Sequence, residues 1–342
     1  MKRRNINLDV LRCIGLIYIV GLHFFHNIHF FDEPIIGASR YLGILLKNWF
    51  TSCVPIFIMV TGYFIHKRTF SLKHYLGLSK VLTLYGLACI PIWVFRTVHF
   101  NEIYTMKTLF YHYMSFEGYC WYIGIYIGLY CLIPFLNVMY HQLETKRNKM
   151  LLIGTFILFT SMPTLTNLFI PNLIPRNYDA LYPLTYYFLG AFLSEYAQDV
   201  KWKASKLFSL YGIIVFVGGT FVNICVAGRM YYDNFVFINY ENILAVTSTM
   251  VLFLAVLKCN FSKLPKFLCY IIETASTASL QLFVVSYIFD TLIYEELNTP
   301  FYTYEDKLIR LPLIIIVVLI NSYIIAHITQ KLYNYIMKKV AA

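Results

Sequence analysis

The sequence predicts an all-α, polytopic integral membrane protein with about ten transmembrane helices and both termini in the cytoplasm. Composition is the first observation behind this class: 59% of the 342 residues are hydrophobic, 13% are charged, and the mean hydropathy is +0.63. A soluble chain carries about 25% charged residues. The second observation is that apolar segments of roughly bilayer length recur along the whole chain. The third is that basic residues gather in every second connection between them.

The apolar segments are predicted to form ten spans, with boundaries good to a few residues. The spans cover residues 8–29, 41–65, 75–97, 119–140, 149–170, 180–197, 206–228, 242–258, 268–292 and 308–332. The sixth and eighth are short, and the sixth opens on Tyr182-Pro183. No connection is long enough for a separate soluble domain, so we expect a single transmembrane domain over residues 1–342.

The basic residues also predict the orientation. Most of the 28 lysines and arginines lie at the two chain ends and in alternate connections, while the remaining connections hold most of the acids. The positive-inside rule therefore places both termini in the cytoplasm. The net charge of +11 does not predict a nucleic-acid partner, because the basic residues are dispersed between apolar segments and form no single patch.

An acid, an arginine and a histidine share one face of the first apolar segment. Asp9 and Arg12 are three positions apart, so their side chains can meet on a helix. His23 follows Arg12 by almost three helical turns, which puts both on one face about 16 Å apart. Ionisable groups inside a membrane are costly and usually mark a functional path. The alternative is that Asp9 and Arg12 form an ion pair near the membrane surface and that His23 is a core residue whose hydrogen bonds are satisfied.

A histidine at this place could accept the proton of a hydroxyl group as its oxygen attacks an acyl carbon. Arg12 could hold an anion or orient a carbonyl group, and Asp9 would fix Arg12 in place. His26 and His29 continue the segment, but no other clustered ligands accompany them. The eight cysteines include no Cys-x-x-Cys pair. We therefore expect no metal site and no disulfide framework.

Basic residues also lie at the cytoplasmic ends of the second and third predicted spans: Lys67, Arg68, Lys73 and Lys80. Ordinary positive-inside charge explains each of them singly. As a group they would also suit a polyanionic co-substrate such as coenzyme A, arriving from the cytoplasm with its phosphates.

Four motifs resemble those of the membrane acyltransferase 3 family. Asn7-Leu-Asp-Val-Leu-Arg12, followed by ten residues and His23, is similar to the first-helix signature of that family. The chain also contains, in order, three segments that are similar to further blocks of the family: Val54–Tyr63, Trp121–Pro134 and Tyr186–Phe192. The hydropathy pattern extends the resemblance over the whole chain.

The resemblance implies an O-acyltransferase that uses acetyl-coenzyme A, or another acyl-coenzyme A, as a co-substrate rather than as a tightly bound cofactor. The acceptor would be a hydroxyl group of a cell-surface polysaccharide or of its lipid-linked precursor. On this resemblance His23 would be catalytic with Arg12 in support, and Trp121 would line the site. From the residues themselves we expect Asp9 to hold Arg12, Lys80, Lys73 and Arg68 to bind the donor, and Tyr122 to bind the substrate with Trp121. The expected surroundings are the lipid of a bacterial cytoplasmic membrane and other polysaccharide-biosynthesis proteins.

The chain departs from the family pattern at three places. Where the family often carries two arginines entering the third helix, this chain has Gly77 and Lys80. Lysine keeps the charge but loses bidentate pairing to phosphate. Cys120 stands where a histidine commonly precedes the tryptophan, and the late-helix histidine is missing near Thr277.

The rival hypothesis is a polysaccharide exporter without acyl transfer, with a non-catalytic scaffold or sensor as a further alternative. An exporter would line a route through several spans with polar residues. The residues that favour this hypothesis are Asn223, Asn242, Glu273, Gln281, Asp290 and Asn321. Each could equally make a helix-end or interhelical hydrogen bond.

Overall fold

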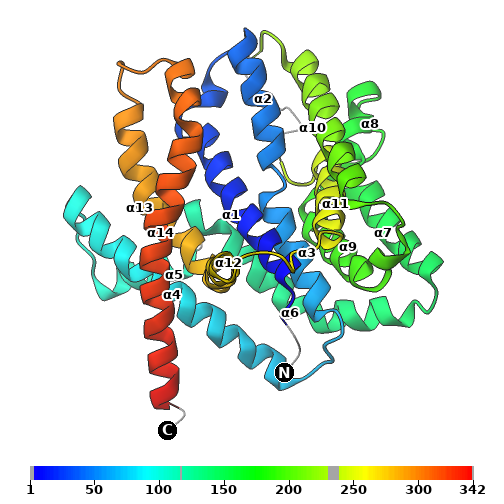
Figure 1. The fold of residues 1–342 in the computed structure, drawn as a ribbon, viewed down its shortest axis with the longest axis horizontal. Helices are drawn as coiled ribbons and strands as arrows, with labels where there is room; N and C mark the ends of the chain where they lie inside the picture. The colour runs from blue at the N-terminus through cyan, green and yellow to red at the C-terminus, as the bar shows by residue number, and fades with distance from the viewer. Residues whose placement is uncertain (1–3, 116–117, 230–238, 341–342) are drawn as a thin grey trace. The chain divides into compact units, whose positions relative to one another are not determined.

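A computed structural model describes residues 4–115, 118–229 and 239–340, and these residues contain helices and no β-strand (Figure 1). The all-α class is therefore confirmed. The α-helices are α1 (Ile6–Asn27), α2 (Ala38–Phe50), α3 (Cys53–Ile65), α4 (Leu72–Phe100), α5 (Met106–Ser115), α6 (Trp121–Gln142), α7 (Lys146–Thr160), α8 (Pro163–Phe169), α9 (Tyr182–Tyr196), α10 (Ala204–Val226), α11 (Ile243–Leu257), α12 (Lys266–Thr277), α13 (Ser279–Leu297) and α14 (Tyr304–Val340).

Each predicted span falls on one helix or on two consecutive helices. Within the described residues, six helical stretches are long and apolar enough to cross a membrane: α1, α2 with α3, α4, α6, α10 and α14. Two bent pairs, α7 with α8 and α12 with α13, raise the number to eight if each pair is one span. The chain is thus a multi-pass membrane protein. The count of ten and the cytoplasmic termini stay predictions.

The sixth and eighth predicted spans correspond to α9 and α11, which have 15 residues each. A helix of that length covers about 22 Å, less than the roughly 30 Å of a hydrocarbon core. These two helices therefore do not qualify as spans by length.

Prolines account for two of the helix breaks. Pro55 lies in the first turn of α3 and Pro163 opens α8. A proline has no backbone N–H to donate to the preceding turn, so the ladder of α2 or α7 cannot continue through it. The axis bends by 50° between α7 and α8.

The chain forms two compact units. Unit 1 contains residues 1–69 and 132–264, and unit 2 contains residues 70–131 and 265–342. The chain passes from unit 2 back to unit 1 within α6, so neither unit is a continuous stretch of sequence. A single domain over residues 1–342 stays a prediction.

In unit 1, α9 is the inner helix, and α3, α7 and α11 pack against it. Its side chains at Tyr186, Tyr187 and Phe188 are fully buried. A helix that is apolar on all sides is stable only when neighbours surround it. By contrast, α10 exposes an apolar stripe, Ile213, Phe216, Val217 and Ile224, as expected for a face that meets lipid.

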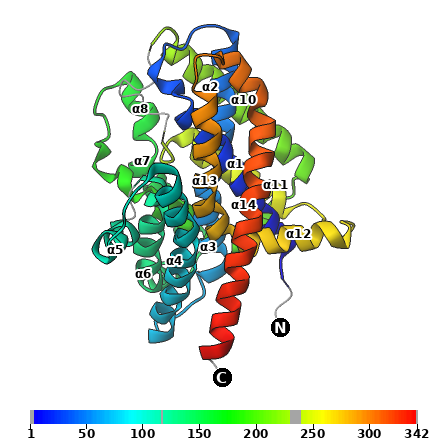
Figure 2. The same ribbon diagram turned by 90° about the vertical axis from the view of Figure 1, so that its left-hand side faces the viewer.

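In unit 2, α13 packs against both α4 and α14, and the views of Figures 1 and 2 agree that α13 and α14 run side by side. The start of α4 is joined to α6 by His74 and Tyr130. Their rings stack at 4.2 Å, His74 Nε2 lies 2.8 Å from the Tyr130 carbonyl oxygen, and the Tyr130 hydroxyl donates to the His74 carbonyl oxygen. These contacts hold the first half of α6 against α4.

Two glycines let the backbones of α3 and α9 touch. A Cβ atom at Gly62 would lie 2.1 Å from the Tyr187 carbonyl oxygen, and one at Gly190 would lie 2.0 Å from the Met59 carbonyl oxygen. Glycine is the residue that permits such close helix contact inside a membrane.

We expect Gly190→Ala to destabilise the folded protein by at least about 3 kcal/mol, because the added methyl group meets backbone rather than a movable side chain. Thermal unfolding of the detergent-solubilised protein would measure this loss. The control is Gly154→Ala on α7, where a Cβ atom meets nothing within 4 Å. Equal melting temperatures for the two variants would contradict the close contact between α3 and α9.

Candidate functional site

Asp9 is the buried centre of the first candidate site. It lies in the first turn of α1, where a negative charge is favourable beside the positive end of the helix dipole. Its side chain is bound by Arg4, with distances of 2.6 Å from Nε to Oδ2 and 2.9 Å from Nη2 to Oδ1. Arg12 Nη1 is 3.8 Å from Oδ1. The predicted meeting of Asp9 and Arg12 is present, but Arg4 is the closer partner.

Sequence reasoning missed the role of Arg4, because a basic residue before a first span looks like an ordinary orientation signal. Arg12 itself turns toward α3, where its guanidinium carbon lies 5.3 Å from the centre of the Phe64 ring. That distance suits a cation–π contact. Arg12 is thus held between an acid and an aromatic face, in a fixed place beside α3.

The motif residue Asn7 has a structural task. Its Nδ2 donates to the carbonyl oxygens of Val256 at 2.7 Å and Cys259 at 2.9 Å. The last carbonyl groups of a helix have no partner within it, so Asn7 satisfies the end of α11. This contact anchors the start of α1 to the end of α11.

His23 lies on the second half of α1 and is partly buried. Its carbonyl oxygen accepts a hydrogen bond from Asn27 Nδ2 at 2.9 Å. Because one helix carries Arg12 and His23, their separation along the axis is about 16 Å. The two side chains therefore cannot bind the same atom of a substrate.

The remaining predicted site residues divide between the units. Arg68 is exposed just after α3 in unit 1, and its carbonyl oxygen accepts a hydrogen bond from Asn137. Lys73 and Lys80 are exposed on α4 in unit 2, two turns apart on one helix face.

Trp121 and Tyr122 open α6, also in unit 2. Their ring centres are 6.3 Å apart, and the Tyr122 ring is 6.3 Å from the Phe283 ring on α13. The structure therefore gathers Trp121 and Tyr122 with other aromatic side chains of unit 2.

Several polar residues that favoured an exporter have local partners. Asn242 caps the N-terminus of α11, accepting from the Ala245 backbone N–H, and Asn321 donates to the carbonyl oxygen of Val317, four residues earlier on α14. Gln281 donates to Gln330, and Asp290 accepts a hydrogen bond from Tyr119. These four positions thus make a helix cap, a bond within α14 and two bonds between segments of unit 2.

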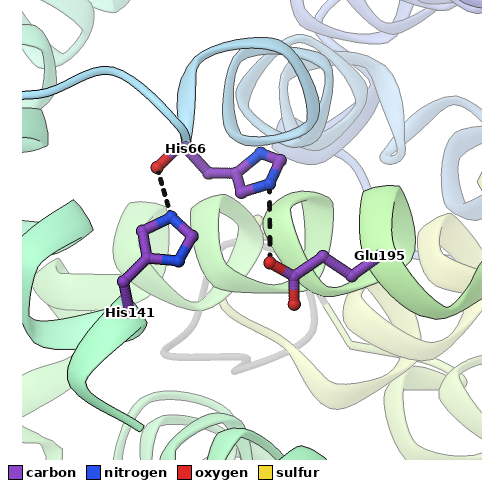
Figure 3. Close-up of side chains that lie close together, drawn as sticks. All are labelled: His66, His141 and Glu195. Atoms are coloured by element: carbon purple, nitrogen blue, oxygen red, sulfur yellow. Dashed lines mark hydrogen bonds and ion pairs between the residues drawn. The ribbon is translucent and has the colours of Figure 1, made fainter. Parts of the chain in front are cut away.

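A second cluster of functional groups, which the sequence did not predict, lies at one end of unit 1. It consists of His66, His141 and Glu195, each of which offers one ligand atom within 4.8 Å of the others (Figure 3). His66 directly follows α3, and His141 and Glu195 are the next-to-last residues of α6 and α9. Only tertiary packing brings these helix ends together.

Hydrogen bonds to backbone carbonyl groups orient both imidazole rings. His66 Nδ1 is 3.2 Å from the carbonyl oxygens of Gly62 and Tyr63, and His141 Nε2 is 2.8 Å from the carbonyl oxygen of His66. A carbonyl oxygen only accepts, so these nitrogens carry the protons. Burial lowers the pKa of His66, although the Glu195 carboxylate acts against this. In the neutral rings, His141 Nδ1 therefore keeps a lone pair, and the lone pair of His66 Nε2 faces the Ser194 hydroxyl.

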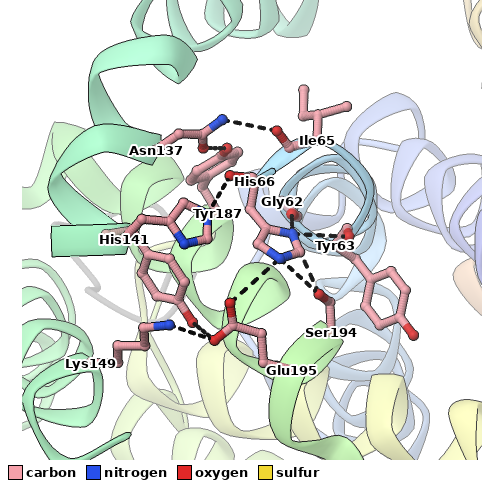
Figure 4. Close-up of polar contacts among 11 residues, drawn as sticks. Gly62, Tyr63, Ile65, His66, Asn137, His141, Lys149, Tyr187, Ser194 and Glu195 are labelled. Atoms are coloured by element: carbon pink, nitrogen blue, oxygen red, sulfur yellow. Dashed lines mark hydrogen bonds and ion pairs between the residues drawn. The ribbon is translucent and has the colours of Figure 1, made fainter. Parts of the chain in front are cut away.

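The Glu195 carboxylate joins His66 to a buried lysine (Figure 4). One oxygen, Oε1, is 3.7 Å from His66 Nε2, and the other, Oε2, is 2.7 Å from Lys149 Nζ and 3.3 Å from the Tyr140 hydroxyl. The Lys149 ammonium also lies 4.5 Å from the centre of the Tyr140 ring. Its charge is therefore balanced both by an acid and by an aromatic face.

The cluster does not have the geometry of a Ser-His-acid relay. The Ser194 hydroxyl is 3.1 Å from His66 Nε2, the same nitrogen that faces Glu195. In such a relay the acid binds the other ring nitrogen and leaves Nε2 for the serine. Here backbone carbonyl groups occupy Nδ1.

A family model described as an acyltransferase domain matches residues 5–327, nearly the whole chain. The chain belongs to the acyltransferase 3 family. The resemblance predicted from the four motifs is thereby confirmed, and membership implies membrane acyltransferase activity. No curated protein and no solved structure matches the chain.

We expect Arg4→Gln to lower the thermal stability of this acyltransferase more than Arg12→Gln does, by about 1 kcal/mol for a partly exposed ion pair. The reason is that Arg4 makes the two short hydrogen bonds to Asp9, whereas Arg12 makes the longer contact. Parallel unfolding curves in detergent would measure the difference. A larger loss in Arg12→Gln would show that Arg12 is the main partner of Asp9.

Proposed function

We propose that the protein transfers an acetyl or other short acyl group from acyl-coenzyme A to a hydroxyl group of a cell-surface polysaccharide or its lipid-linked precursor. It would act as an O-acyltransferase in a bacterial cytoplasmic membrane, in contact with membrane lipid and other polysaccharide-biosynthesis proteins. The observation that carries the proposal is the line of Asp9, Arg12 and His23 along α1, in a member of a membrane acyltransferase family.

His23 is the proposed general base. Its imidazole accepts the proton of the sugar hydroxyl while the hydroxyl oxygen attacks the carbonyl carbon of the thioester. The new C–O bond gives the ester, the C–S bond breaks, and coenzyme A leaves as its thiolate. The proton on His23 then neutralises the thiolate or passes to solvent, which returns the imidazole to its neutral form.

Arg12 is proposed to bind the donor. At about 16 Å from His23 it cannot stabilise the oxyanion at the reacting carbon, but it can hold another part of the long acyl-coenzyme A molecule. A guanidinium group stays charged and donates in a fixed planar fork, which suits that task. Asp9 and the Phe64 ring keep Arg12 in position.

The residues proposed to bind the phosphates of the donor are basic and lie before or at the start of the third predicted span. Lys73 and Lys80 are exposed on one face of α4, and Arg68 is exposed after α3. Exposed cations attract a polyanion over several ångströms and need no rigid geometry. Trp121 and Tyr122 present aromatic rings at the start of α6, where a sugar ring could stack.

We expect His23→Ala to abolish acylation of the glycan while polymer still reaches the cell surface. Mass spectrometry or NMR of glycan from cells with wild type, deletion or His23→Ala at matched expression would measure the acyl content. His29→Ala, a change to an exposed histidine just after α1, is the control and should keep wild-type acylation. Loss of surface polymer in the deletion strain, with unchanged acylation, would instead favour an exporter.

We also expect Lys80→Ala to raise the KM for acyl-coenzyme A roughly tenfold with little change in kcat, because the lysine attracts phosphates and takes no part in the chemical step. Initial rates with purified protein in detergent would separate the two constants. Lys331→Ala, on α14, is the matched control and should leave both unchanged. A fall in kcat with an unchanged KM would show that Lys80 does not bind the donor.

A further inference from the structure

We infer that His66, His141 and Glu195 form a binding site for one divalent transition-metal ion, with zinc the best match. The inference is independent of the proposed acyl transfer, since that reaction is assigned to Asp9, Arg12 and His23 on α1. It differs from the sequence-based expectation of no metal, because the ligands come from three separated helix ends.

The donor set has the chemistry of a zinc site. Two imidazole nitrogens and one carboxylate oxygen are common zinc ligands, and three protein ligands leave a fourth position for water. The three ligand atoms lie within 4.8 Å of one another. Around a tetrahedral ion with bonds of about 2.1 Å the ligands are roughly 3.4 Å apart, so binding requires a small contraction.

The arrangement can supply that contraction. His141 is the next-to-last residue of α6 and is exposed, so its side chain can move and an ion can reach it from solvent. His66 is buried and fixed by its backbone contacts. The His141 ring can turn about its hydrogen bond to the His66 carbonyl oxygen and so close on the other two ligands.

Contacts around the ligands favour metal binding further. In zinc proteins a ligating histidine donates its second N–H to a carbonyl or carboxylate group, which sets the tautomer and the ring orientation. Both histidines here do so with backbone carbonyl groups. Figure 3 shows the second nitrogen of His141 turned toward the side of the Glu195 carboxylate. A bound ion would replace the Ser194 hydroxyl as the partner of His66 Nε2.

Two lysines among the described residues oppose a cation: Lys149 binds Glu195 directly, and the charge of Lys67 also acts on His66. The Lys149 ammonium binds Glu195 Oε2, while Oε1 faces His66. The carboxylate can therefore bridge an ion on one oxygen and the lysine on the other. The positive charge of Lys149 must weaken metal binding, because like charges repel strongly at a buried site. Replacement of Lys149 by a neutral residue should therefore increase the affinity of the site for the metal ion.

A bound ion would tie together the C-terminal ends of α3, α6 and α9. An ion that binds only the folded protein stabilises it in proportion to its concentration relative to Kd. We therefore expect a bound ion to stabilise this end of unit 1.

The test uses the full chain, purified in detergent with a tag that contains no histidine and treated with a chelator. Titration with Co²⁺, followed by visible absorption, reports the number of equivalents bound and the ligand type. We expect one saturable equivalent, displaced by Zn²⁺, with no sulfur-to-cobalt charge-transfer band. Zn²⁺ should also raise the melting temperature of the wild type.

Three variants complete the test. His141→Ala should weaken Co²⁺ binding at least about 100-fold, beyond the loss seen when only an outer contact is removed. His29→Ala, which changes a histidine outside the cluster, should bind Co²⁺ as the wild type does. Lys149→Met should bind roughly tenfold more tightly.

Three results would overturn the inference: no saturable equivalent, unchanged binding in His141→Ala, or a thiolate band that assigns the ion to cysteine. Because His141 is exposed at a helix end, His141→Ala is expected to fold. Its melting temperature without metal, compared with that of the chelated wild type, verifies this. Weaker binding in Lys149→Met would assign Lys149 a role in holding Glu195 and contradict the predicted competition.

Discussion

The rest of unit 1 depends on the backbone contact between α3 and α9 at Gly62 and Gly190. A side chain at either glycine would separate the two helices. One turn beyond each glycine lie His66 and Ser194, which are in contact with each other. The two helices therefore run in the same direction, and their C-terminal ends meet. The His66–His141–Glu195 cluster exists because the crossing is close enough to bring these ends together.

The same crossing explains why α9 can be short. A 15-residue helix surrounded by α3, α7 and α11 does not have to meet lipid along its length. The predicted orientation is consistent with the cluster, since His66 and His141 directly follow spans predicted to end in the cytoplasm and Glu195 lies near the end of a third. Lys149 begins the next span from that side. Four helix ends with ionisable groups thus meet where water can reach them through the exposed His141.

At α1, two arginines stabilise a buried carboxylate. Asp9 is 3% exposed and has two arginines around it, one of them in the segment that precedes the helix. A buried carboxylate needs such partners to offset its lost hydration. The arrangement leaves Arg12 turned toward α3 and His23 on the far half of the helix. In the proposed reaction the helix separates donor binding from proton transfer, and its rigidity sets the distance between them.

The sequence was enough to predict the membrane class, the all-α fold and the family, because hydropathy, charge alternation and short motifs are local along the chain. It also placed Asp9 beside Arg12, since helical spacing alone brings residues three apart together. It could not show Arg4 as the closer partner of Asp9, nor the broken spans at α8 and α13. Only tertiary packing decided the His66–His141–Glu195 cluster, because residues 75 positions apart, such as His66 and His141, meet through helix packing that no local pattern encodes.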